Sequence, residues 1–389
     1  MKNNNLFGFL SNEYYKLMLD MAKEGPLNKD DVEHRFHSLD TNRLFEVCKE
    51  HELEGVAGSC AISLGINLPT YWQEAYQKTY LRQNFLKEKA KEICSLMDEQ
   101  GIKMVILKNG GIMLSIIENP AKCPMEDIDT LIKKDDFYKA HNILIDNGFV
   151  FKFRSEYEKD LLDEAFRHGS AEYYFVMPNG EKMWLELSWR TIDGRWIRPD
   201  LEPNTDLFIE NSFVPKGTKA HVLCSEDNLL QVCIHTAKHS YCRAPGLRLH
   251  LDVDRIVTHC SIDWDLFLKK VNDCHVRTSV YFSLYIPTVL FETKVPSYVL
   301  ESLKPKNSSR IERMLSKASL IHPHNNKKFS KIGFLRFQTA LYDKKSDIVR
   351  VIYPSKEWIN QRYGCKHFLK RSYCVFIRLL DLIGIRKRK

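Results

Sequence analysis

The apolar residues of the chain follow a helical spacing up to residue 100 and then change to a strand-like spacing. Residues 70–101, "TYWQEAYQKTYLRQNFLKEKAKEICSLMDEQG", end in Gly101, a typical residue at the end of a helix. "IKMVIL" (102–107) is a short apolar run of the kind that forms a buried strand. This change of period predicts a β-sheet that begins after a helical region.

Further strand patterns follow within about 90 residues. They are "EDIDTLIK" (126–133), "FVFKFR" (149–154), and the pair "AEYYFVM" and "KMWLELSW", which flanks the turn "PNGE" (178–181) and predicts a hairpin. Between the first two lies "KDDFYKAHNILIDNG" (134–148), with apolar residues at helical spacing and a closing glycine. From residue 225 the spacing is helical again.

These patterns predict an α+β fold with a small mixed β-sheet flanked by N-terminal and C-terminal helical regions. We expect four parts: an N-terminal helical region (1–100), a sheet-containing core (101–215), a C-terminal helical region (216–360) and a basic amphipathic tail (361–389).

The net charge of +8 belongs to the tail. Residues 361–389 contain nine lysines and arginines against one acid, Asp381, so residues 1–360 are formally neutral. A broad nucleic-acid-binding surface is therefore not expected.

The chain has eleven cysteines, scattered singly without a CxxC pair, and we expect reduced thiols and no zinc site. The N-terminal apolar stretch is too short for a signal peptide. No apolar run approaches the roughly 18 residues of a transmembrane helix. These features favour a cytoplasmic protein.

Two acidic residues, Asp127 and Asp129, lie in the second predicted strand. Side chains at i and i+2 of a strand point the same way, so these carboxylates share a face and repel one another. A divalent metal ion, Mg²⁺ or Mn²⁺, is the first candidate for the positive charge between them. Glu186, in "WLELSW", could supply a third carboxylate to a two-metal site.

The turn "KNGG" after the first predicted strand is suited to bind phosphate. Gly110 and Gly111 would let backbone N–H groups approach phosphate oxygens at a helix N-terminus, and Lys108 could join them. A triphosphate site beside a carboxylate site contains the parts needed for nucleotidyl transfer.

The order "GG…DID…LEL", preceded by "GIKMVILK" and followed by "IHTAKH…LDVDRIV…IDWD", resembles the bacterial nucleotidyltransferase-like proteins of the DNA polymerase β superfamily. More narrowly, it resembles an uncharacterised nucleotidyltransferase family often found with polysaccharide and peptide-modification genes. The resemblance covers most of the chain, including "YPSKEWINQRYG" (353–364). It implies Asp127 and Asp129 as metal ligands, Glu186 as the third carboxylate, and Gly110 with Gly111 at the triphosphate.

The function expected from the residues and the resemblance is transfer of NMP from an NTP to a hydroxyl- or phosphate-bearing acceptor. Three positions differ from the family's usual pattern: Asn109 stands where glycine follows the lysine, Cys123 where an arginine precedes the first aspartate, and Ser188 where a histidine follows the third carboxylate. They motivate a second interpretation, a non-catalytic binding or scaffold protein. A D-x-D nucleotide-sugar glycosyltransferase is the third.

Other candidate residues have competing interpretations. His235 and His239 would share a helical face, either as a second metal site with Asp252 and Asp254 downstream or as core histidines. The resemblance would allow Lys238 or His239 to face the active site. The arginines after the third carboxylate could bind an anionic acceptor or belong to a solvated loop; they are Arg190, Arg195 and Arg198.

The tail forms an amphipathic pattern with a basic face that includes Lys366, Lys370, Arg371 and Arg378. It could lie on an anionic membrane surface, or it could be a terminal helix packed on its own domain.

Overall fold

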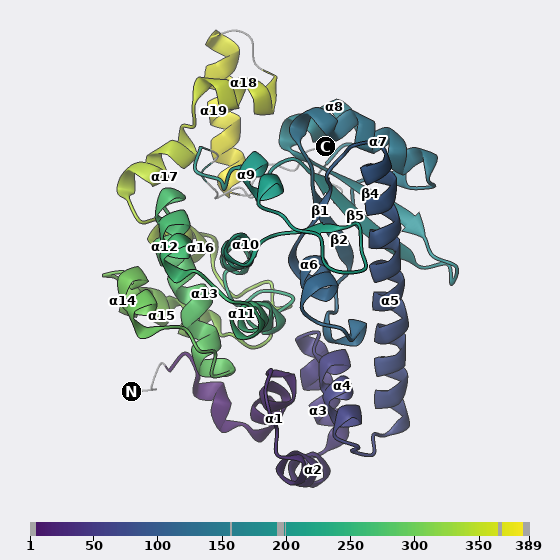
Figure 1. Cartoon of the computed structure of the whole chain (residues 1–389). Coiled ribbons are helices and arrows are strands. Elements are labelled where there is room, and N and C mark those ends of the chain that lie inside the picture. Colours follow the sequence, from purple (N-terminus) through teal and green to yellow (C-terminus); the bar gives the residue numbers. More distant parts are fainter. Residues whose placement is uncertain (1–4, 156–157, 193–197, 199, 365–367, 384–389) are drawn as a thin grey trace.

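The structure, a computed structural model, describes residues 5–155, 158–192, 198, 200–364 and 368–383 (Figure 1). The N-terminal region is helical, as its apolar spacing predicts, after a short 3₁₀ turn, Gly8–Ser11. Its helices are α1 (Glu13–Ala22), α2 (Lys29–Ser38), α3 (Thr41–Glu50), α4 (Glu54–Ser63) and the long α5 (Thr70–Glu99).

A six-stranded mixed sheet forms the centre of the fold, in the order β3-β4-β5-β2-β1-β6. β2 runs parallel to β5, and β1 runs parallel to β6, while the remaining pairs are antiparallel. The strands are β1 (Val105–Ile106), β2 (Asp127–Leu131), β3 (Val150–Phe151), β4 (Ser170–Val176), β5 (Lys182–Ser188) and β6 (His221–Val222).

The predicted α+β class is confirmed, including the β4–β5 hairpin. β6 lies beyond residue 215 and has no counterpart among the predicted strands. The antiparallel pairs and the helical N-terminus also argue against the extended parallel sheet of a nucleotide-sugar glycosyltransferase.

Alternation along β2 and β5 gives the sheet two different faces. Ile128, Leu185 and Leu187 are fully or almost fully buried, whereas Asp127 and Asp129 point the other way and are partly exposed. α5 packs against β2 and against two of the sheet helices. The sheet helices are α6 (Lys108–Ser115), α7 (Phe137–Asp146), α8 (Leu162–His168) and α9 (Thr205–Glu210), with short 3₁₀ turns at Pro120–Lys122 and Lys134–Asp136.

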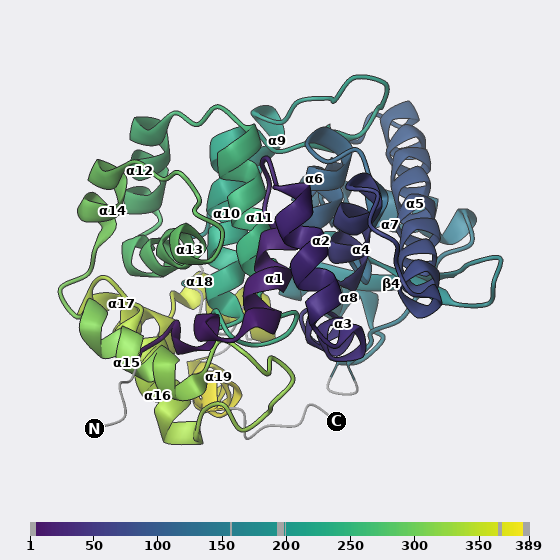
Figure 2. The same cartoon turned by 90° about the horizontal axis from the view of Figure 1, so that it is seen from below.

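The C-terminal helices pack beside the sheet (Figure 2), where α10 and α11 contact α6 and α18 contacts α8. One continuous hydrophobic core includes residues of the N-terminal helices, the sheet and the C-terminal helices up to residue 341, whereas Ile359 and Cys374 belong to a separate small cluster. The C-terminal helices are α10 (Ser225–Lys238), α11 (Arg248–His259), α12 (Trp264–Asp273), α13 (Arg277–Leu290), α14 (Ser297–Leu303), α15 (Ser308–Ala318), α16 (Lys331–Ala340), α17 (Lys345–Ile352), α18 (Lys356–Tyr363) and α19 (Phe368–Ile383).

The tail helix α19 packs against α17 and α18. Arg378, expected on the basic face, is instead only 4% exposed: its Nε donates to the carbonyl of Val351, and its guanidinium lies over the Trp358 ring. Lys366 and residues 384–389 lie outside the described residues. Within the described residues, no helix is both long enough and apolar enough to cross a membrane.

Nine cysteines in the described part of the chain are free thiols, as expected. Cys374 contradicts the expectation, because it is disulfide-bonded.

A buried ion cluster joins the N-terminal helices to the C-terminal ones. Arg255 of α11 has no exposed surface, and its Nε lies 3.2 Å from Oε1 of Glu24, just after α1. Lys122 and His259 also lie beside Glu24, at 3.4 Å each. A buried arginine is tolerated only when a partner neutralises it, so Glu24 fixes the two regions together.

Replacing Glu24 by glutamine should lower the free energy of unfolding by about 3 kcal/mol, because Arg255 would then lose its carboxylate in a buried site. Urea denaturation followed by circular dichroism measures the change. Glu99→Gln, at the exposed end of α5, is the control and should be nearly neutral. Equal effects of the two substitutions would contradict this role of Glu24.

The same cluster predicts a pH dependence. Burial alone would raise the pKa of Glu24, but Arg255, Lys122 and His259 outweigh it, and the pKa is lowered from 4.5. A lowered pKa stabilises the folded state above the unfolded value and loses that stabilisation as the pH falls through the folded value. The difference in unfolding free energy between wild type and Glu24→Gln should therefore be present above pH 4.5 and shrink as the pH falls below it.

Candidate active site

Side chains of α5 hold the segment that leads into β2. Gln83 donates from Nε2 to the carbonyl of Met125 at 3.0 Å, and Arg82 donates to the carbonyl of Glu126 at 3.4 Å. Both carbonyls lie immediately before Asp127. The long helix therefore fixes the point at which the D-x-D pair begins.

The strand register collects four carboxylates on one side of the sheet. Asp129 pairs with Glu186 on β5, and Glu186 pairs with Glu172 on β4. Asp127 lies two residues before Asp129 and shares its face. We call this set, Asp127, Asp129, Glu172 and Glu186, the carboxylate face. The sequence-predicted acids are thus brought together, with Glu172 added.

Two cations of the chain itself lie on the carboxylate face. The Lys108 ammonium is 2.7 Å from Oδ1 of Asp129. The Arg154 guanidinium, from the segment after β3, is 2.5 Å from Oδ2 of Asp127 and 3.1 Å from Oε1 of Glu172. These ion pairs offset part of the repulsion between the four acids.

Protonation equilibria reflect the remaining negative charge. Burial is the largest cause that raises the pKa of Asp129, and the neighbouring charges of Asp127 and Glu186 raise it further, while Lys108 opposes them. Burial would lower the pKa of Lys108, but the surrounding carboxylates raise it overall. The lysine is therefore charged, and the face still favours an additional cation.

The turn from β1 into α6 is strained and closely packed. Lys108 has a φ of 51°, which L-residues rarely adopt and which is frequent at functional sites. A Cβ atom on Gly110 would lie 2.7 Å from Cγ2 of Ile106, and one on Gly111 would lie 2.9 Å from the carbonyl oxygen of Ile106. The glycine pair therefore has a packing role, and its contact with a triphosphate stays a prediction.

The three departures from the family pattern have structural partners. The Asn109 amide donates to the carbonyl of Pro124 at 3.0 Å and ties α6 to the approach to β2. Cys123 is buried, with its sulfur 3.9 Å from a guanidinium nitrogen of Arg255. Ser188 donates to Oε1 of Glu186 at 3.4 Å and restrains it. The substituted residues thus support the site's framework.

The carboxylate face fits a divalent metal by its chemistry, since oxygen donors from neighbouring strands and an excess of negative charge are what Mg²⁺ selects. No group of three or more His, Cys, Asp or Glu side chains among the described residues is already gathered to hold a metal ion. Lys108 and Arg154 contact the aspartates instead.

The remaining sequence candidates lie in different places. The rings of His235 and His239 are 4.7 Å apart, and His239 Nδ1 is 2.6 Å from the carbonyl oxygen of Ala244. Burial lowers the pKa of both histidines, and the Lys108 charge lowers it further. Their helix, α10, packs against α6, which begins with Lys108. Asp254 accepts a hydrogen bond from Thr293 at 2.6 Å, so it serves the helical core.

The arginines after the third carboxylate form structural contacts where they are described. Arg190 is paired with Glu202, and Arg198 is paired with Asp200 and Asp347. Arg195 lies outside the described residues.

Sequence reasoning missed Glu172 and Arg154. The hairpin contains a signal for Glu172: with Val176 opposite Lys182, counting four residues back along β4 and four forward along β5 puts Glu172 opposite Glu186. Arg154 lies in the predicted strand 149–154, but β3 ends at Phe151, and the spacing does not predict the reach of this side chain across β5 to Asp127.

The mixed sheet with flanking helices is consistent with a nucleotidyltransferase-like core. Residues 37–292 match the family model described as "uncharacterised nucleotidyltransferase", and the chain belongs to this family. Nucleotidyl transfer is the general function that this assignment supports. The match ends before "YPSKEWINQRYG", which the sequence resemblance included. No curated protein matches the chain.

Arg154→Ala should lower the melting temperature without divalent metal, because Asp127 and Glu172 would lose the ion pairs that they form with this arginine. Mg²⁺ should raise the melting temperature of this variant by more than it raises that of wild type. Thermal denaturation with and without Mg²⁺ measures both effects. Arg154→Lys keeps the charge and should behave like wild type, whereas a metal response independent of residue 154 would contradict the model of shared carboxylates.

Proposed function

We propose that this chain is a metal-dependent nucleotidyltransferase that moves NMP from an NTP to a hydroxyl- or phosphate-bearing acceptor and releases pyrophosphate. The observation that carries the proposal is the pairing of Asp129 with Glu186 on adjacent parallel strands, with Asp127 on the same face. The family assignment supports the same chemistry. A role in polysaccharide or peptide modification is part of the proposal and rests on the sequence resemblance.

In the proposed reaction, an acceptor oxygen forms a bond to the α-phosphorus of the NTP while the bond from that phosphorus to the bridging oxygen of pyrophosphate breaks. Asp127 and Asp129 would hold the metal, and Glu186 would complete the site on the acceptor side. The Glu186 carboxylate can accept the proton of an acceptor hydroxyl. Ser188, which donates to Glu186, keeps that carboxylate oriented.

The triphosphate would lie at the first turn of α6. Leu107 occupies the N-cap position of this helix, and no side chain there accepts a hydrogen bond from the first turn. Because the first N–H groups of a helix lack intrahelical partners, they are suited to bind phosphate oxygens. Lys108 begins the same turn and would balance the added negative charge. When bound, Mg²⁺ or Mn²⁺ would neutralise phosphate charge and lower the pKa of the attacking group.

The alternative is a protein that kept the fold and lost turnover. The contacts of Lys108 and Arg154 with the two aspartates are the observation that favours it, because a metal ion has to compete with them.

The first test is a thermal-shift panel of ATP, GTP, CTP and UTP with Mg²⁺ or Mn²⁺. At a concentration about 100 times the Kd, binding adds about 2.7 kcal/mol of stability and should raise the melting temperature by about 3 °C. The Asp127→Asn/Asp129→Asn variant should lose the metal-dependent rise. Pyrophosphate release with the stabilising nucleotide then tests turnover.

Asp135→Asn/Asp136→Asn is the matched control, since it removes two acids from the 3₁₀ turn after β2 and should keep the response. If no nucleotide stabilises wild type, the enzyme proposal fails and the alternative takes its place.

A further inference from the structure

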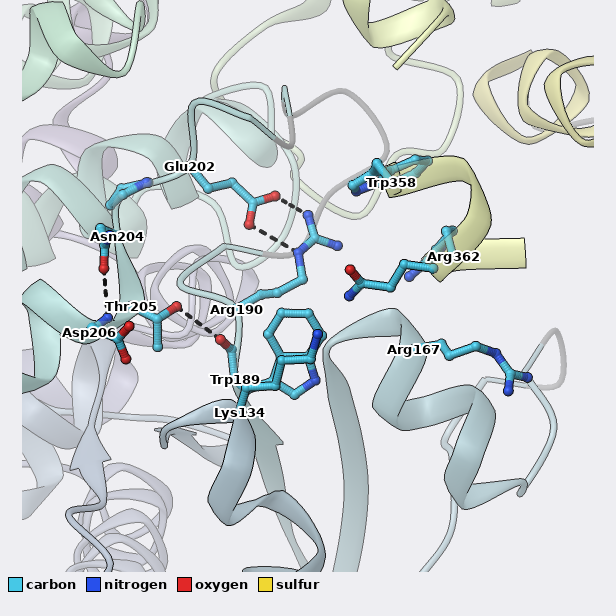
Figure 3. A pocket seen from close by; sticks show the side chains of 12 residues that line it. Lys134, Arg167, Trp189, Arg190, Glu202, Asn204, Thr205, Asp206, Trp358 and Arg362 are labelled. Atoms are coloured by element: carbon cyan, nitrogen blue, oxygen red, sulfur yellow. Dashed lines mark hydrogen bonds and ion pairs between the residues drawn. The ribbon is translucent and has the colours of Figure 1, made fainter. Parts of the chain in front are cut away.

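A cavity of about 360 Å³ lies where β5 ends, between the sheet and the C-terminal helix α18 (Figure 3). Trp189 and Arg190 line it from the end of β5, Lys134 from the turn after β2, and Trp358 and Arg362 from α18. Its size is at the lower end of the range for small-molecule sites. The function derived above does not use this cavity.

The cavity lining has more positive than negative charge. Lys134, Arg167, Arg190 and Arg362 line it together with two carboxylates, which leaves a surplus of two positive charges. One of these carboxylates, Glu202, forms an ion pair with Arg190, whose Nε lies 3.0 Å from Oε2 of Glu202 (Figure 3). Lys134 and Arg167 form no ion pair within the described residues. The surplus therefore favours an anionic ligand.

The arginines are held in place by the framework. Arg190 and Arg362 both donate to the carbonyl of His168, at 3.3 and 3.1 Å, so the end of α8 joins β5 to α18. Gly169 follows with a φ of 101°, and a Cβ atom there would collide with the Arg190 side chain. These contacts organise the cavity before any ligand enters.

Two indole rings form apolar walls. The Trp189 ring is fixed by its N–H, which donates to the carbonyl of Phe166 at 2.8 Å, and the Lys134 ammonium lies 4.5 Å from the ring centre. The Trp358 ring carries the Arg378 guanidinium at 5.0 Å. Flat apolar walls beside cations suit a ring compound that carries a phosphate.

The polar lining favours a sugar ring over a nucleobase. Gln361 and Asp206 supply amide and carboxylate groups, which pair with hydroxyls as donors or acceptors. Each indole already has a cation over its ring. The two rings are therefore not arranged to hold a nucleobase between two aromatic faces.

The cavity begins at the residues that directly follow β5, the strand of Glu186. Trp189 lies three residues after Glu186, about 10 Å along an extended chain. We propose that the cavity binds a phosphorylated sugar as the acceptor or its terminal unit, an inference that rests on the proposed function. Because the family match ends at residue 292, the wall formed by α18 lies outside the matched region and would add acceptor selectivity.

Titration of the full chain with glucose 1-phosphate, followed by tryptophan fluorescence without NTP or metal, tests the proposal. Saturable binding is expected, at least about tenfold tighter than that of glucose, inorganic phosphate or AMP. Lys134→Gln and Arg167→Gln should each weaken it about tenfold, and Lys133→Gln, the exposed neighbour, should not.

Absence of saturable binding, equal affinity for inorganic phosphate or AMP, or unchanged binding in both cavity variants would overturn the proposal. The Asp127→Asn/Asp129→Asn variant should bind glucose 1-phosphate like wild type. If this variant binds glucose 1-phosphate and wild type shows no nucleotide response, the nucleotidyltransferase proposal is contradicted and the sugar-phosphate site is supported. A nucleotide response without sugar-phosphate binding would support the nucleotidyltransferase proposal and contradict the sugar-phosphate site.

Discussion

Repulsion among four carboxylates on one face of the sheet is the constraint around which the centre of this fold is arranged. The parallel β2–β5 register and the antiparallel β4–β5 hairpin bring the acids together. Lys108 reaches them from the first turn of α6, and Arg154 from the segment after β3. Without these cations the strands would carry unpaired charge into a partly buried site, which folding tolerates poorly.

The same arrangement explains why metal and nucleotide binding would be linked. Carboxylates that already contact a lysine and an arginine bind a metal ion more weakly than bare ones, but the displaced cations can then turn to phosphate groups. Charge is redistributed within the site instead of being added to it. The strained backbone of Lys108 and the glycine-dependent contact of α6 with Ile106 hold the lysine beside Asp129, where the proposed metal and triphosphate would meet.

Local patterns in the sequence predicted the fold class, the hairpin and the common face of Asp127 and Asp129, because strand alternation and turn chemistry are local properties. The pairing of Glu186 with Asp129 agrees with the resemblance, although the role of each acid in catalysis stays a prediction. β6 could not be found, since two residues carry no period and the strand exists only through its pairing with β1. Arg154 and the buried position of Arg378 depend on tertiary contacts that no spacing encodes.

The cavity at the end of β5 is assembled from residues far apart in the chain, from Lys134 to Arg362. During synthesis the sheet can pair as soon as β6 has emerged, whereas this cavity has no outer wall until α18 follows more than 130 residues later. A growing chain would therefore complete the carboxylate face well before the cavity. The order of assembly separates, in time, the part of the chain that the family model matches from the helix that closes the cavity.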